Sequence, residues 1–240
     1  MGKVVAVKVE GRNFSIALKK AFAAIGGKGF LQALLKGKRL VSLKVNTLAG
    51  KKLSTSPELT LALAEILSLE LGKDVIIWDR TERELKRAGF SIKKRGSIKI
   101  IATDTPRVGY YEELIQHKNI GSLFSRIQMA CDASISVAVA KDHDLSGVSL
   151  SMKNYYGAIH NPNKYHDKIG DPYIADLWLI PDIKNKTKLI ITTPNCFSYG
   201  AIGTIITGKE VVHPDHVLKM SYKTLKQLIK KKGLKVVYFT

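Results

Sequence analysis

The chain has 240 residues, of which 45% are hydrophobic, and its mean hydropathy is −0.02. These values are typical of a soluble globular protein with a full hydrophobic core. No stretch approaches the ~18 to 20 consecutive apolar residues of a membrane-spanning helix, so we expect no membrane segment. The first residues, Met1 to Val7, lead directly into a strand pattern and lack the features of a secretory signal, which predicts a cytoplasmic protein.

The charge of the chain is strongly unbalanced. It has 39 lysine and arginine residues against 20 aspartate and glutamate residues, which gives a formal net charge of +19 at pH 7. Such a charge attracts nucleic acids, anionic lipids and small anionic substrates. The simpler interpretation is a lysine-rich protein whose basic residues are spread over solvated surfaces. No nucleic-acid-binding motif accompanies the charge, so nucleic acid is an alternative partner that we do not favour.

The two cysteines, Cys131 and Cys196, are far apart in the sequence. No Cys-x-x-Cys pair occurs, so we expect no iron–sulfur cluster and no structural zinc site built from the thiolates of this chain. The pattern does not indicate a disulfide either. Cys131 ends a predicted helix and is interpreted as a small buried hydrophobic residue.

Apolar patterns in the first part of the chain alternate between those of strands and those of helices. Val4–Val9 alternates apolar and polar residues as a half-exposed strand does, and Phe14–Ile25 has helical spacing before two glycines. A hydroxyl residue followed by Pro57 is typical of a helix start. The further predicted elements are a strand at Leu40–Val45, a helix from Pro57 to Leu71, a strand at Val75–Trp78, a helix at Thr81–Ala88 and a strand at Ile98–Thr103.

The alternation continues after a predicted loop at residues 104–118. The predicted elements are a helix at Ser122–Ala130, a strand at Ile135–Ala140, a helix at Pro172–Leu179, strands at Leu189–Thr193 and Thr204–Thr207, a helix at Pro214–Lys232 and a strand at Val236–Phe239. Strands that alternate with helices predict a single α/β domain over residues 1–240, built as a three-layer sandwich with a mainly parallel, Rossmann-like sheet. Neither a dinucleotide-binding glycine motif nor a Walker A motif occurs.

Polar residues are concentrated between Lys141 and Asp167, directly after the predicted buried strand Ile135–Ala140. The segment gathers three histidines, three tyrosines and several lysine, asparagine and aspartate residues, which packing alone does not explain. Ligands of open α/β sheets bind outside the carboxyl ends of the strands. The sequence therefore predicts a functional site at this edge of the sheet.

Three polar residues at other strand ends are candidates for the same site. Lys44 and Asn46 lie at the end of the second predicted strand, and Asp79 ends the third. Lys44 is expected to hold an anion with the help of Asn46. The alternatives are an exposed lysine, an asparagine that caps a turn, and an aspartate that caps the helix beginning near Thr81.

The segment itself supplies groups that can transfer protons or bind metal. Three histidines, His143, His160 and His166, suggest an acid–base role or a divalent metal, although their spacing matches no standard zinc signature. Lys153 could hold a phosphate or carboxylate or form a covalent adduct, and Asn154 follows it. The alternative for Lys153 is a surface lysine at a helix end.

At these residues the chain resembles a known family. The runs from Asp142 to Gly157 and from Asn161 to His166 look like the hallmark of the domain-of-unknown-function 362 family. Leu43-Lys44-Val45-Asn46 is similar to its early Leu-Lys-Pro-Asn motif, with valine in place of proline. The resemblance covers roughly residues 4 to 232.

Two stretches depart from the family pattern, at Thr192–Phe197 and at Glu210–Asp215. The divergent segment 193–214 leaves open whether the chain is a non-catalytic remnant of the family. Some family members carry an added ferredoxin-like domain, which implies an iron–sulfur link for those relatives and not for this chain.

A fainter similarity to the lactate racemase family rests on three positions, His143, Gly147 and Lys153. In lactate racemase a lysine at this spacing tethers a nickel-pincer cofactor, and histidines serve as metal ligands or as the acid–base group. The resemblance implies corresponding roles for Lys153 and His143.

The sequence thus predicts an enzyme or ligand-binding protein for a small anionic molecule, with metal assistance as an option. The expected catalytic residues are His143, Lys153 and His166; the expected ligand-binding residues are Lys44, Asn46, Asn154 and Asp79; the expected metal ligands are His143, His160 and His166. The alternatives are nucleic-acid binding through the basic surface and the remnant hypothesis. The substrate, the reaction and the oligomeric state stay open.

Overall fold

The structure is a computed structural model that describes residues 3–48, 50–143, 147–194 and 235–239. The predicted strand at Thr204–Thr207, the predicted helix at Pro214–Lys232, Cys196 and nearly all of the divergent segment 193–214 lie outside these residues.

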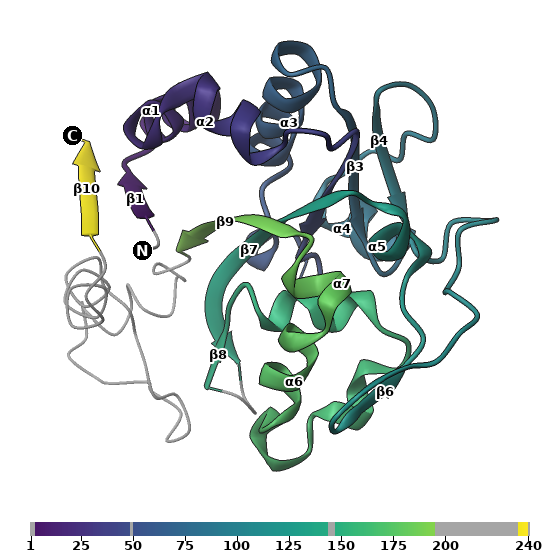
Figure 1. Cartoon of the computed structure of the whole chain (residues 1–240). Coiled ribbons are helices and arrows are strands. Elements are labelled where there is room, and N and C mark those ends of the chain that lie inside the picture. The colour runs from purple at the N-terminus through teal and green to yellow at the C-terminus, as the bar shows by residue number, and fades with distance from the viewer. Residues whose placement is uncertain (1–2, 49, 144–146, 195–234, 240) are drawn as a thin grey trace.

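Five parallel strands form the central sheet, in the order β4-β3-β2-β7-β9 (Figure 1). Their bounds are β2 Leu40–Val45, β3 Asp74–Asp79, β4 Ile98–Ala102, β7 Ala133–His143 and β9 Thr187–Pro194. A short strand, β8 (Gly147–Ser149), turns back antiparallel along the end of β7. The predicted α/β class with a mainly parallel sheet is confirmed.

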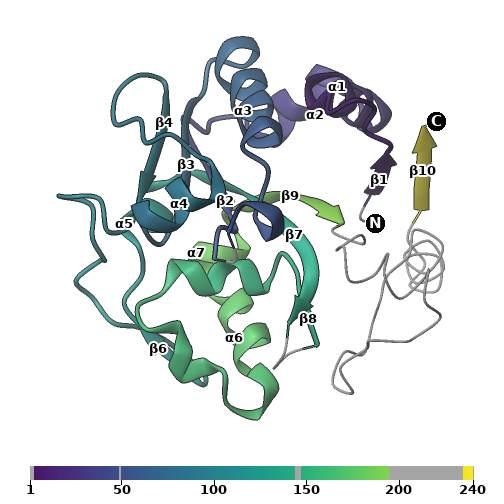
Figure 2. The same ribbon diagram turned by 180° about the vertical axis from the view of Figure 1, so that it is seen from behind.

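Helices cover one face of the sheet with a large apolar cluster. The strands turn alternate side chains to this face, among them Val41, Leu43 and Val45 of β2, which are fully buried. The helices are α1 Phe14–Ile25, α2 Gly27–Leu34, α3 Pro57–Glu65 with its π-helical continuation η2 Ile66–Glu70, and α4 Glu82–Ala88. Figure 2 shows α1 and α3 on the side of the sheet away from α6 and α7.

A second apolar cluster lies on the opposite face, around Trp78, Phe124, Tyr155 and Leu177. Its helical elements are α5 Arg126–Ala130, α6 Tyr173–Leu179, α7 Pro181–Lys184 and the 3₁₀ turns η3 Lys153–Ala158 and η4 Pro162–Tyr165. A further 3₁₀ turn, η5 Asp167–Gly170, follows η4. Two clusters separated by one sheet make three layers, as predicted.

The second face of the sheet is polar where η3 covers it. Ser42 and Lys44 of β2 and Ser134 and Ser136 of β7 point to this face, and all four are buried. Buried polar groups are costly unless they are hydrogen-bonded. Ser42 Oγ donates to Ser134 Oγ at 3.1 Å, and Ser134 Oγ lies 3.0 Å from the hydroxyl of Tyr155 in η3. Hydrogen bonds therefore fix η3 on these two strands.

Two small sheets lie outside the central one. β1 (Lys3–Val7) and β10 (Lys235–Phe239) pair in parallel beside α1. β5 (Ile115–His117) and β6 (Ile120–Ser122) form a hairpin. Among the described residues, no helix has the length and apolar character needed to cross a membrane.

The sequence prediction was wrong at 104–130 and incomplete after Ile25. The segment predicted as a loop and a longer helix contains β5, β6 and the short helix α5. Helix α5 begins after Ser125, because the Ser125 hydroxyl accepts a hydrogen bond from the Ile127 N–H. Gly26 ends α1 in a left-handed conformation with φ 119°, and α2 starts at the next residue. A 3₁₀ turn, η1 (Lys51–Leu53), precedes α3.

Candidate functional site

Lys44 lies at the carboxyl end of β2 and is buried, with 1% of its surface exposed. Strand alternation turns it to the polar face, beneath η3. Its Nζ donates to the carbonyl of Val45 at 2.7 Å, to Oδ1 of Asp79 at 2.7 Å and to Oδ1 of Asn154 at 3.3 Å. An ammonium group has three protons, so every donor of Lys44 is used within the protein.

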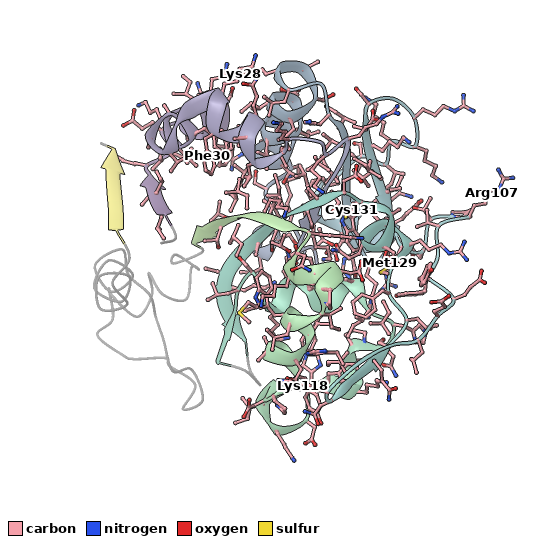
Figure 3. The ribbon with its side chains drawn as sticks, viewed as in Figure 1. Lys28, Phe30, Arg107, Lys118, Met129 and Cys131 are labelled. Carbon is pink, nitrogen blue, oxygen red and sulfur yellow. The ribbon has the colours of Figure 1, made fainter. Side chains whose placement is uncertain are left out.

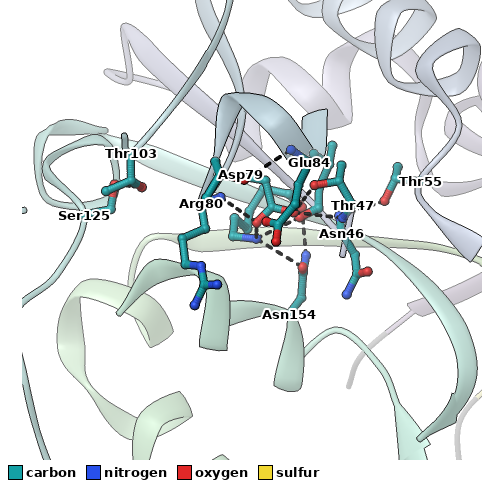
Figure 4. Close-up of polar contacts among 12 residues, drawn as sticks. Asn46, Thr47, Thr55, Asp79, Arg80, Glu84, Thr103, Ser125 and Asn154 are labelled. Carbon is teal, nitrogen blue, oxygen red and sulfur yellow. Dashed lines mark hydrogen bonds and ion pairs between the residues drawn. The ribbon is translucent and has the colours of Figure 1, made fainter. Parts of the chain in front are cut away.

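Asp79, at the end of β3, is equally saturated (Figure 4). Its Oδ1 accepts from Lys44 and from the backbone N–H of Arg80 at 2.8 Å. Its Oδ2 accepts from the N–H and the hydroxyl of Thr47, at 2.8 and 2.7 Å. Such hydrogen bonds offset the cost of burying the charge.

η3 forms a roof over this ion pair. The amide of Asn154 donates to the carbonyl of Lys44 at 2.8 Å and to Ser136 Oγ at 3.1 Å. At Gly157, a Cβ atom would lie only 2.6 Å from Lys44 Nζ and 2.7 Å from Asp79 Oδ1. Only glycine leaves room for this approach. We call Lys44, Asp79, Asn154 and Gly157 the buried junction.

The buried junction holds three strands and η3 together, and no hydrogen-bonding position of Lys44 or Asp79 is left for a ligand. In the structure Lys44, Asp79 and Asn154 bind one another and support the site, and the ligand-binding roles that the sequence suggested for them stay predictions. Asn46 is different, because its side chain is only partly buried and reaches another lysine.

Lys141, near the end of β7, is that lysine. Its Nζ donates to Asn46 Oδ1 at 3.0 Å and to the carbonyl of Leu53 at 3.1 Å. Burial lowers the pKa of Lys141, and the carboxylate of Asp79 opposes this effect. The sequence prediction did not single out Lys141, although its position directly after an apolar strand was a usable signal.

Lys153 and His166 lie side by side on the same face of the sheet. Lys153 Nζ is 3.1 Å from His166 Nε2 and 4.6 Å from the centre of the Tyr156 ring. The rings of Tyr156 and His166 form a T-shaped contact. Burial, and then the ammonium of Lys141, lower the pKa of Lys153 to about 8. Lys141 thus acts on Lys153 electrostatically. We call Lys141, Lys153 and His166 the basic cluster.

The hydrogen bonds of His166 indicate its protonation state. Nδ1 lies 3.1 Å from the carbonyl of Pro162, which can only accept, so Nδ1 carries the proton. Nε2 then accepts from the ammonium of Lys153. Burial lowers the pKa of His166, and the neighbouring Lys153 ammonium lowers it further. Lys153 and His166 can therefore share or relay a single proton.

We expect Lys153 to react with acetic anhydride with a pH midpoint near 8, because only the neutral amine is nucleophilic and its pKa is lowered from 10.5 to about 8. Residue-resolved mass spectrometry of the native protein across pH 6 to 11 measures the midpoint. Lys36, an exposed lysine of the opposite layer, is the internal reference. A Lys153 midpoint as high as that of Lys36 would contradict the lowered pKa.

The three predicted metal-ligand histidines are not seen as one group. His160 packs edge-on against Tyr110, with the ring centres 5.2 Å apart, whereas His166 contacts Lys153 and Tyr156. Over the part of the chain that the structure describes, no cluster of three His, Cys, Asp or Glu residues could hold a metal ion. The side chain of His143 lies outside the described part, so its catalytic and metal-binding roles stay predictions.

Comparison with known proteins gives one family match. A family model described as a domain of unknown function (DUF362) matches residues 41–229. No curated protein matches the chain.

Two solved structures are similar at low identity. The lactate racemase apoprotein from Thermoanaerobacterium thermosaccharolyticum has a TM-score of 0.49 and 15% identity, over 80% of this chain and 50% of that one. A protein from Thermotoga maritima has a TM-score of 0.43 and 12% identity, over 96% of this chain and 52% of that one. The chain thus spans about half the length of either structure.

Proposed function

Because the chain belongs to the domain-of-unknown-function 362 family, as its motifs predicted, and that family's description names no activity, we propose a function from the site: the binding of a small anionic molecule at the basic cluster. The ligand would lie at the carboxyl edge of the sheet, next to Lys153 and His166, with Lys141 and Asn46 behind it. A reaction would follow binding if Lys153 and His166 transfer their shared proton to or from the ligand.

The contact between Lys153 Nζ and His166 Nε2, at 3.1 Å, carries this proposal. Among the described residues, neither Lys141 nor Lys153 forms an ion pair with a carboxylate, although both are more than half buried. The carboxylate of Asp79 partly offsets the charge of Lys141, but the Lys141 ammonium still repels the partly desolvated ammonium of Lys153. An anion between them would relieve this repulsion and is therefore favoured at this place.

Proton transfer is the chemistry that the pair supports if the protein is an enzyme. A lysine with a pKa of about 8 exists in both protonation states near neutral pH, which is the condition for efficient general acid–base catalysis. His166, with its proton on Nδ1, would take or return the proton through Nε2. A covalent adduct at the neutral amine of Lys153 is the second option for the same group.

We expect anion binding to depend on Lys153. In isothermal titration calorimetry at pH 7 with pyruvate and lactate as probes, Lys153→Gln should weaken the binding of the preferred probe at least tenfold. His166→Gln should also weaken it, because the amide cannot take up a proton from Lys153 as the imidazole can. Lys36→Gln, an exposed charge removal on the opposite layer, is the matched control and should leave affinity unchanged.

Equal affinity in Lys153→Gln and the original protein would refute the proposal. The same variants also test the nucleic-acid alternative. Salt-dependent binding of a short oligonucleotide that survives both Lys153→Gln and His166→Gln would favour a basic surface outside the cluster.

A further inference from the structure

An open hollow of about 470 Å³ lies at the same edge of the sheet, beyond the ends of β3 and β4. Its lining residues are Arg80, Thr81, Asp104, Tyr110, His160 and Asn161. The volume falls within the range of about 300 to 1,000 Å³ that is common for small-molecule sites. None of these residues belongs to the basic cluster.

Arg80 is the main cation of the hollow. Its backbone N–H is held by Asp79, and Figure 4 shows its side chain extending away from the buried junction. Arg80 is partly buried, and its guanidinium has no hydrogen bond or ion pair with any described residue. Five N–H donors in a planar fork are thus available at the wall of the hollow.

Backbone pairing brings His160 and Asn161 to the other wall. The N–H of His160 donates to the carbonyl of Leu123 at 2.9 Å, and Phe124 forms a bridge with Ile159. The side chains of His160 and Asn161 have no hydrogen-bond partner among the described residues. The position of the histidine ring is set by its edge-on contact with Tyr110, at 5.2 Å between ring centres.

Thr81 and Tyr110 add hydroxyl groups. The Thr81 oxygen accepts from the N–H of Glu84 at 3.1 Å, so its proton remains free to donate. Burial raises the pKa of the Tyr110 phenol, which keeps it protonated and able to donate. The acidic lining residue, Asp104, is engaged by the N–H of Glu82 at 2.8 Å. Donors outnumber acceptors in the hollow.

We propose that this hollow binds the phosphoryl group of a small phosphorylated molecule. Arg80 would hold two of its oxygens through the guanidinium fork, and Thr81, His160 and Asn161 would donate to it from other directions. A tetrahedral group with three terminal oxygens accepts from several directions at once, whereas the two oxygens of a carboxylate accept mainly in one plane. The inference goes beyond the proposed function and does not depend on it.

Phosphorus NMR and calorimetry on the full chain test the site, with inorganic phosphate and phenyl phosphate as probes. Arg80→Gln should weaken the affinity for both at least tenfold, and His160→Gln at least threefold. Arg80→Lys should also weaken it, because a point charge cannot replace the fork. The matched control is Arg107→Gln, which removes an arginine from the projecting loop labelled in Figure 3, outside the hollow. Circular dichroism verifies that each variant is folded.

Two further results separate this inference from the proposed function. Phosphate binding should persist in Lys153→Gln. Loss of phosphate binding in Lys153→Gln but not in Arg80→Gln would overturn the Arg80 site and leave the basic cluster as the anion site. An equal loss of phosphate affinity in Arg80→Gln and Arg107→Gln would mean that phosphate is attracted by the overall positive charge, which would overturn the site. A benzoate affinity equal to that of phenyl phosphate would refute the preference for a phosphoryl group.

Discussion

Replacing Asp79 with alanine is expected to lower the free energy of unfolding by about 3 to 5 kcal/mol, because it leaves the ammonium of Lys44 buried without its counter-charge. Lys44 is 1% exposed and Asp79 5%, so water cannot replace the lost partner without opening the structure. Asp79 also anchors Thr47 and the N–H of Arg80. Urea denaturation of the original protein and the variant, at constant m-value, measures the difference.

A double variant without either charge distinguishes the cost of an unpaired buried charge from the cost of lost packing. Lys44→Met combined with Asp79→Leu removes both charges and should be more stable than Asp79→Ala alone, because apolar replacements avoid the desolvation of an unpaired ion. Glu10→Ala removes an exposed partner of Lys8, 3.9 Å away, and should change stability by ~0 to 1 kcal/mol. A loss from Asp79→Ala as small as that would mean that the buried junction contributes little.

Gly157→Ala is the second large effect that we expect. Its new methyl group would meet Lys44 Nζ at 2.6 Å and Asp79 Oδ1 at 2.7 Å, well inside van der Waals contact. A flexible lysine end would normally move aside, but this one is held by three hydrogen bonds. Over-packing of this kind costs about 1 to 3 kcal/mol, and more where hydrogen bonds also break.

The matched control for Gly157→Ala is Gly121→Ala in β6, where a Cβ atom would make only an ordinary contact of 3.6 Å with Gln116. Thermal melts of both variants, read by circular dichroism, make the comparison. Similar melting temperatures for the two alanine variants would show that η3 can lift from the sheet at little cost. In that case the close roof over Lys44 would not be a constraint.

The sequence predicted most of the central sheet and its helices because those elements carry strong periodic signals. Phe14–Ile25 and Leu40–Val45 have the same bounds in the prediction and in the structure. Helix α2 was missed because Gly27 and Gly29 disfavour a helix, and packing of Leu31 into the first apolar cluster overrides this preference. The β5–β6 hairpin was missed because strands of three residues show no alternation.

The sequence placed its candidate residues at one edge of the sheet but could not tell which of them bind one another. Lys44 and Lys153 look alike as lysines near strand ends. Only the structure shows that η3 seals one of them and leaves the other beside His166. The sequence did not single out Arg80 and Lys141. Whether their N–H groups are free to bind a ligand depends on which acceptors the fold brings beside them.

The pairing of β1 with β10 has a consequence for the order in which the protein assembles. Lys3 is paired with Lys235, 235 − 3 = 232 positions later. At synthesis rates of about 5 to 20 residues per second, β1 waits roughly 10 to 50 s for its partner strand. The described strands of the central sheet end at Pro194, so this part of the sheet can form first. β1–β10 contacts made this late in folding would slow unfolding and leave the folding rate unchanged.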